Sequence, residues 1–234
     1  MTESFPDERW WFVGACVMAG ALAVPLHGIA TPVSAAAAGI IGLAGLRVWR
    51  WSRLAHLMRR SDQRGLRRLL RPGMWMGLGL MVGLLILGVI RIAIEPRIPS
   101  MGARIARAGA LPVWRRFLII YVAAVGEELA FRLLLLSVIA GLAVRVLRRP
   151  ALEPAPAVAW IANVLSAGAF AAAHLPAWIG VTSPSLGLTA SVLALNAIGG
   201  IVLGYVFVTR GIAAAMWVHA GADCAIQILG PLTG

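Results

Sequence analysis

The chain has 234 residues, of which 60% are hydrophobic and only 13% charged, and its mean hydropathy is +0.87. A soluble domain usually has about a quarter of its residues charged, so this composition excludes an ordinary soluble protein and predicts a multi-pass membrane protein. The formal net charge of +12 comes mostly from arginines between the hydrophobic runs. We interpret these arginines as topology determinants and contacts for anionic lipids. No nucleic-acid motif accompanies them, so no nucleic-acid partner is expected.

The hydrophobic runs predict an all-α fold, a polytopic bundle of about seven transmembrane helices. The predicted spans lie near residues 10–30, 33–50, 74–95, 117–143, 157–174, 187–208 and 211–230. We interpret residues 1–234 as a single integral membrane domain. Its amino-terminal spans and a basic loop occupy 1–116, and its core occupies 117–230.

Between the second and third spans, the segment Arg50–Pro72 is the most basic stretch of the chain. Its apolar residues at helical spacing favour an amphipathic interfacial helix, and a solvated basic loop is the alternative. A second interfacial helix is expected near residues 100–112. The positive-inside rule places Arg50–Pro72 and Arg145–Arg149 in the cytoplasm. High Ala, Gly and Arg usage is typical of a multi-pass protein of the cell inner membrane.

The span near 117–143 contains three charged residues in an otherwise apolar run: Glu127, Glu128 and Arg132. A charge at mid-bilayer costs about 2.5–3.5 kcal/mol on insertion scales, so these residues need a structural or functional reason. Glu128 and Arg132 are four residues apart with the acid first, which favours an ion pair on one helix face. Glu127 is rotated by about 100° from Glu128 and has no cation one turn away, which leaves it available as a general base.

Two further clusters lie on later spans. Phe170 and His174 are four residues apart in "FAAAH", and His219 and Asp223 are four apart in "HAGAD". A carboxylate one turn from a histidine can hold the orientation of its imidazole ring. The small residues between these positions leave space for water or a substrate backbone. Because intramembrane ionisable residues are functional by default, we expect the clusters to share one polar site.

Each cluster also has a simpler structural interpretation. A Glu–Arg pair can be a clamp between helices, and a histidine in a membrane helix can make an interhelical hydrogen bond. A proton-coupled transporter would bury similar acids, but it predicts an inverted internal repeat, and the sequence shows none. The concentration of all these groups in the carboxy-terminal half favours a local reaction site.

Taken together, the three motifs resemble those of one family. "EELAFR" resembles the EExxxR motif, "FAAAH" the FxxxH motif and "HAGAD" the HxxxN/D motif of the CPBP family, the CAAX-protease and bacteriocin-processing family also called Abi. They occur in the family's order over roughly residues 117–230, whereas 1–116 match only generic spans. The resemblance implies an intramembrane endopeptidase that acts on a membrane-anchored or lipidated peptide or protein.

The resemblance also implies a role for each matching catalytic position. Glu127 would activate the hydrolytic water, and His174 would share that task. His219 and Asp223 would support the oxyanion or orient the site. Because an ionised aspartate cannot donate a hydrogen bond, orienting His219 is the role we expect for Asp223.

Three matching residues are expected to be supporting rather than catalytic. The resemblance implies that Glu128 and Arg132 complete the first motif, and we expect this ion pair to be mainly architectural. Phe170 belongs to the second motif and lies one turn from its histidine.

The motif residues allow two versions of the protease, one with zinc and one without. Glu127, His174 and His219 could ligate zinc with an open coordination position, with Asp223 as a further donor, but no HExxH motif is present. We favour a metal-free, glutamate-type mechanism without a cofactor. A non-catalytic binding or immunity protein is the alternative function, because family likeness does not guarantee turnover.

Overall fold

The fold is given by a computed structural model, which describes residues 13–21, 31–52, 54, 71–147, 156–179 and 185–233. Within these residues, the regular elements are all helical, which confirms the predicted all-α fold. Residues 13–21 form a short helix. The elements that follow are α2 (Thr31–Trp51), α4 (Arg71–Val89), η2 (Ile90–Ile94), α5 (Pro99–Ala108), α6 (Val113–Glu127), η3 (Glu128–Leu136), α7 (Ser137–Val146), α8 (Pro156–Ile179), α9 (Leu186–Arg210), α10 (Ile212–Cys224), η4 (Ala225–Leu229) and η5 (Gly230–Leu232).

Five helical stretches of the described residues are long and apolar enough to cross a membrane: Pro72–Ile94, Val113–Val146, Pro156–Trp178, Leu186–Arg210 and Ile212–Leu232. They correspond to the last five predicted spans and make this a multi-pass membrane protein. The second predicted span falls within α2, and residues 13–21 lie in the first. Most of the predicted interfacial helix at Arg50–Pro72 lies outside the described residues. The one near 100–112 corresponds to α5, whose ten residues are too few to span a bilayer.

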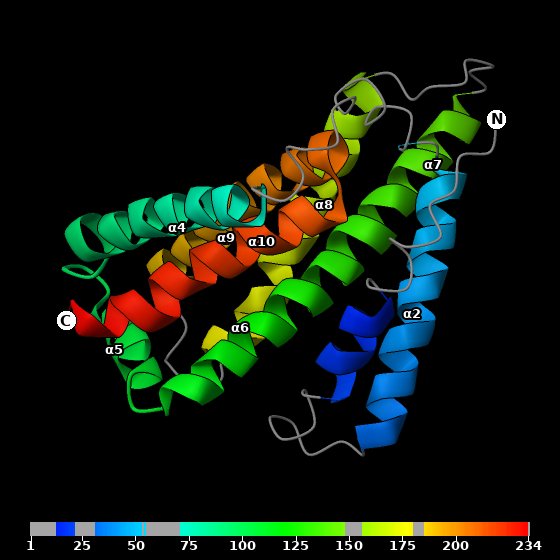
Figure 1. Cartoon of the computed structure of the whole chain (residues 1–234). Coiled ribbons are helices and arrows are strands. Elements are labelled where there is room, and N and C mark those ends of the chain that lie inside the picture. Colours follow the sequence, from blue (N-terminus) through cyan, green and yellow to red (C-terminus); the bar gives the residue numbers. More distant parts are fainter. Residues whose placement is uncertain are drawn as a thin grey trace.

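One long helix runs through the bundle (Figure 1), because α6, η3 and α7 continue into one another without a break. It contains 34 residues. At 1.5 Å per residue it is about 50 Å long, so it must tilt or extend beyond the hydrocarbon layer. Helix α2 contacts its η3 and α7 parts, and α10 contacts its α6 and η3 parts. The middle of this helix is therefore enclosed by neighbours from both ends of the chain.

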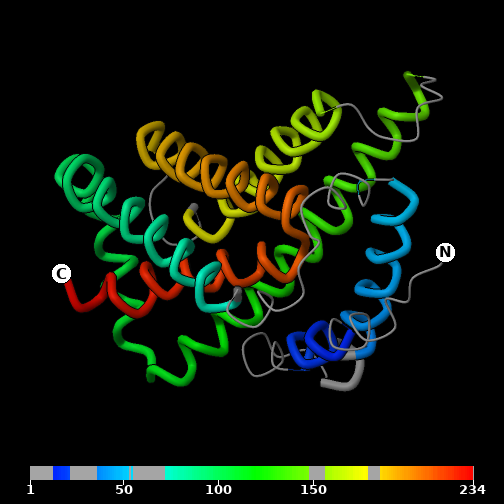
Figure 2. Tube along the Cα trace, turned by 45° about the horizontal axis from the view of Figure 1, so that its top comes forward, coloured from blue at the N-terminus to red at the C-terminus, as the bar shows by residue number. Residues whose placement is uncertain are grey.

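Helices α9 and α10 are joined by a turn at one residue, Gly211. Its φ of 94° lies in the left-handed region, which favours glycine at a helix end. At the other end of α9, the Ser185 hydroxyl accepts a hydrogen bond from the Leu188 amide at 3.1 Å and caps the helix. The turn at Gly211 reverses the chain at once. It brings α10 back through the bundle beside α9 and α4 (Figure 2).

Small residues allow the closest helix contacts. A Cβ atom at Gly79 of α4 would overlap the backbone of Val218 in α10, and one at Gly221 of α10 would overlap the backbone of Met76. Between α8 and α9, a Cβ atom at Gly200 would press on Ala167. In lipid, where helices associate through close contact rather than through the hydrophobic effect, such positions hold helices together. They fix the positions of α8 and α10, which carry the histidines.

Candidate active site

The acidic pair Glu127 and Glu128 lies where the long helix changes its winding. α6 ends at Glu127, and the next nine residues form the π-helix η3. π-helical turns are rare and frequently occur at functional sites. Glu127 and Glu128 themselves keep right-handed helical dihedral angles, with φ −74° and ψ −38° at Glu127 and φ −66° and ψ −34° at Glu128. Both approach His219 of α10, at 3.6 Å and 2.9 Å respectively.

Glu128 and Arg132 form the expected ion pair. Glu128 Oε2 lies 3.3 Å from Arg132 Nε, and their side chains are 0% and 1% exposed. Arg132 also donates from Nη2 to the Gly200 carbonyl at 3.3 Å. Its guanidinium carbon lies 4.4 Å from the centre of the Phe170 ring, a cation–π distance. The ion pair therefore joins the long helix to α8 and α9.

The ring of His219 is held by Glu128 rather than by the expected Asp223. His219 Nδ1 lies 2.9 Å from Glu128 Oε1. Because that carboxylate is paired with Arg132, it accepts the bond and Nδ1 carries the proton. Asp223 Oδ2 lies 4.0 Å from Nε2, too far for a direct hydrogen bond, and accepts instead from Gln227 Nε2 at 3.4 Å. The fixed ring turns Nε2 of His219 toward Glu127.

His174 is oriented by its own helix. Its Nδ1 lies 2.8 Å from the Phe170 carbonyl oxygen. A carbonyl only accepts, so this nitrogen is the donor, and in the neutral ring Nε2 keeps a free lone pair. Phe170 also lies against the imidazole, with ring centres 4.5 Å apart. The second motif therefore positions His174 through a backbone bond and a ring contact.

Glu127 is the point where the two histidines converge. Its Oε2 lies 3.7 Å from His174 Nε2 and 3.6 Å from His219 Nε2. This oxygen is buried and has no hydrogen-bond partner in the part of the chain that the structure describes. Polar atoms separated by slightly more than hydrogen-bond distance are suited to a water molecule that bridges them. The structure thus brings Glu127, His174 and His219 together around one space.

The site has a closed side and an open side. The Glu128 side chain is fully buried, and that of His219 is 7% exposed. The side chains of Glu127 and His174 are 31% and 28% exposed. Next to Glu127, Gly126 is exposed, and a Cβ atom there would meet nothing within 4 Å. A substrate backbone can therefore approach Glu127 from this side while the ion pair supports the other.

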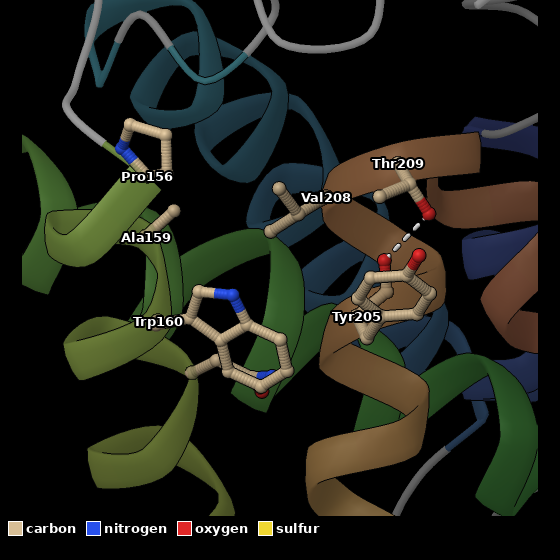
Figure 3. Close-up of a pocket in the computed structure, with 7 residues that line it drawn as sticks. Pro156, Ala159, Trp160, Tyr205, Val208 and Thr209 are labelled. Carbon is tan, nitrogen blue, oxygen red and sulfur yellow. Dashed lines mark hydrogen bonds between the residues drawn. The ribbon is translucent and has the colours of Figure 1, made fainter.

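A separate hollow of about 200 Å³ lies between α8 and α9 (Figure 3). It is lined by Pro156, Ala159, Trp160, Asn163, Tyr205, Val208 and Thr209. The Trp160 and Tyr205 rings stack at 5.9 Å and are exposed at the surface. None of the residues that carry the three motifs lines it, so we assign it no part in the reaction.

The region that contains the motif residues matches a known protein family. A family model described as type II CAAX prenyl endopeptidase Rce1-like matches residues 109–225, which is half of the chain. The match includes Glu127, Glu128, Arg132, His174 and His219. No curated protein and no solved structure matches the chain.

Proposed function

The chain belongs to the Rce1-like family of type II CAAX prenyl endopeptidases, and from this we propose that it hydrolyses a prenylated membrane substrate with a water activated by Glu127. Family membership makes the chain an intramembrane endopeptidase of the CAAX class. We further propose that the reaction is metal-free and assign roles to the motif residues below. A CaaX sequence carries its prenyl group on the cysteine, so the substrate is anchored in the same membrane as the enzyme.

One observation carries the proposal: Glu127 Oε2 faces the Nε2 atoms of His174 and His219 at 3.7 Å and 3.6 Å. In both rings Nδ1 is engaged elsewhere, so Nε2 is the nitrogen left for the reaction. A water between Glu127 and His174 would donate to both acceptors and present its oxygen to a substrate carbonyl. This is the arrangement that general-base catalysis requires.

In the proposed reaction, the water oxygen bonds to the carbonyl carbon of the scissile peptide while Glu127 takes the water's proton. His174 holds the water through Nε2. When protonated, His219 can donate from Nε2 to the carbonyl oxygen as negative charge develops there. The carbon–nitrogen bond then breaks, and the proton held by Glu127 passes to the leaving amine. Glu127 ends as a carboxylate, ready for a second cycle.

The other motif residues support this centre. Glu128 fixes the ring of His219, and Arg132 offsets the cost of burying Glu128. We propose that Asp223 adds negative charge near Nε2 of His219 at 4.0 Å without fixing its ring. These residues act through His219 and are positioning residues.

We propose that no metal takes part. Within the described residues, no three His, Cys, Asp or Glu side chains are grouped as the ligands of one ion. The three atoms that face one another, from Glu127, His174 and His219, are also the donors that zinc would use, so dependence on metal is tested directly. We further propose that the protein resides in the cell inner membrane, where its arginines contact anionic lipids.

The purified protein, reconstituted in lipid vesicles, is expected to cleave a farnesylated peptide that ends in a CaaX sequence. The same peptide without the farnesyl group should be cleaved much more slowly, because it is not held at the membrane. Activity should persist after treatment with a strong zinc chelator. Activity that is lost on chelation and restored by zinc would replace the metal-free mechanism. No cleavage of the farnesylated peptide would favour the non-catalytic binding or immunity protein.

A further inference from the structure

Among the residues that the structure describes, Arg116 is a buried cation without an anionic partner. It lies in the first turns of α6 and is only 7% exposed. In the described part of the chain, its one hydrogen bond runs from Nη1 to the Gln227 carbonyl oxygen at 3.1 Å, and no carboxylate lies within ion-pair distance. Its Nε is buried and has no hydrogen-bond partner among the same residues. Buried guanidinium groups are normally paired, so Arg116 is equipped to receive an anion.

The neighbouring Arg91, at the same end of the bundle, differs from Arg116 in having an anionic partner, although among the described residues its Nε is also buried without a hydrogen-bond partner. Its Nη1 lies 2.7 Å from Glu95 Oε2, and its Nη2 donates to the Gly230 carbonyl at 2.9 Å. Both arginines therefore contact carbonyls in the last turns of the final span. Of the two arginines, only Arg91 has a carboxylate from the described residues beside it. Within that part of the chain the charge of Arg116 is unpaired.

Arg116 is aligned with the reaction centre. It precedes Glu127 by eleven residues of α6, which corresponds to about 20° of rotation and about 16 Å along the axis. The facing helix gives a second measure. His219 and Gln227 are eight residues apart, which corresponds to about 12 Å at the α-helical rise. The Gln227 carbonyl accepts a hydrogen bond from Arg116, and the Gln227 side chain donates one to Asp223. Between Arg116 and Glu127, Ala123 is half-buried and Gly126 is exposed.

This spacing of about 12–16 Å between backbone positions is of the same order as the length of the product of the reaction proposed above, on which the inference rests. An endopeptidase that cuts inside a CaaX sequence leaves at most three residues between the cleaved bond and the free carboxylate. Three extended residues span about 10 Å. We propose that Arg116 binds the carboxy-terminal carboxylate of the substrate and so measures the distance from the chain end to the cleaved bond. A guanidinium is well suited to this task because it can bind a carboxylate through two parallel hydrogen bonds.

The test compares two farnesylated CaaX peptides that differ only in a free carboxylate or a carboxamide at the carboxy terminus. The reconstituted wild type is expected to cleave the free acid with a kcat/KM about ten- to a hundredfold higher, the range for a hydrogen bond to a charged group. In Arg116→Gln, kcat/KM should fall for the free acid, mainly through a higher KM, and should stay nearly the same for the carboxamide. The ratio of the two kcat/KM values should therefore approach one. Arg115→Gln removes the same charge one residue away and should keep the wild-type ratio.

If Arg116→Gln does not fold, two other measurements still test the proposal. Arg116→Lys should retain part of the preference for the acid. The free tripeptide that follows the cysteine should inhibit the wild type more strongly than its amide. Three results would overturn the proposal. They are equal cleavage of acid and amide peptides by the wild type, equal inhibition by the tripeptide and its amide, and an unchanged acid-to-amide ratio of kcat/KM in Arg116→Gln. The role of Arg116 would then be limited to its hydrogen bond to the Gln227 carbonyl. Those outcomes differ from failure of the proposed protease, in which neither peptide is cleaved.

Discussion

Glu127→Gln is expected to reduce cleavage of a farnesylated CaaX peptide by about 10²-fold or more, the lower end of general-base contributions. The substitution keeps the size and shape of the side chain but removes the group that accepts the water's proton. Glu127 Oε2 has no hydrogen-bond partner among the described residues and its side chain is 31% exposed, so within them the change removes no hydrogen bond of this oxygen. The yield of folded protein should therefore stay near that of the wild type. The measurement is kcat/KM in vesicles, together with thermal unfolding of the purified variant.

Glu128→Gln is the matched control, since it makes the same chemical change one residue away. Glu128 is fully buried between Arg132 and His219, so its loss should lower thermal stability, whereas Glu127→Gln should not. Full activity in Glu127→Gln would end the glutamate mechanism. A drop in stability equal to that of Glu128→Gln would show that Glu127 has a structural role instead.

Arg132→Ala is expected to destabilise the fold by about 3–5 kcal/mol, the usual cost of removing one partner from a buried ion pair. It leaves Glu128 charged and fully buried, and it removes the bond to the Gly200 carbonyl and the contact with the Phe170 ring. Arg132→Lys keeps the charge but not the planar fork, so it should recover only part of the stability. Folded yield and melting temperature in detergent measure both changes.

Arg145→Ala serves as the control for Arg132, because it removes an arginine from the same long helix. The Arg145 guanidinium lies 3.6 Å from the centre of the Trp51 ring and is partly exposed. A cation–π contact at an exposed site contributes about 0.5–1 kcal/mol, so the melting temperature should change little. A melting temperature of Arg132→Ala as high as that of Arg145→Ala would mean that Glu128 does not depend on Arg132.

The features that the sequence predicts are those that depend on residues close together in the chain. The last five spans follow from hydrophobic runs of about 20 residues, and the bounds differ from the structure by only a few residues. The Glu128–Arg132 pair follows from the i, i+4 spacing, because both partners lie on one helix. The three motifs each indicated a helix face, and they were predicted to share one site. The structure brings Glu127, His174 and His219 together.

The contacts that the sequence could not predict cross between helices. Glu128 and His219 are 91 residues apart, and the π-helix that begins at Glu128 has no signature in "EELAFR". The expectation that Asp223 orients His219 rested on spacing within one helix, and the contact from Glu128 replaces it. The bond from Arg132 to Gly200 uses a backbone carbonyl, which any residue type would supply.

The most direct test of the central claim, that Glu127 and His174 act on one water, is a double-mutant cycle in the vesicle assay. Glu127→Gln and His174→Ala should each lower kcat/KM strongly, and the double variant should be little worse than either single variant. Residues that act as one unit lose their function together, so their effects are not additive. Losses that multiply in the double variant would show that the two residues contribute independently and would contradict a shared water.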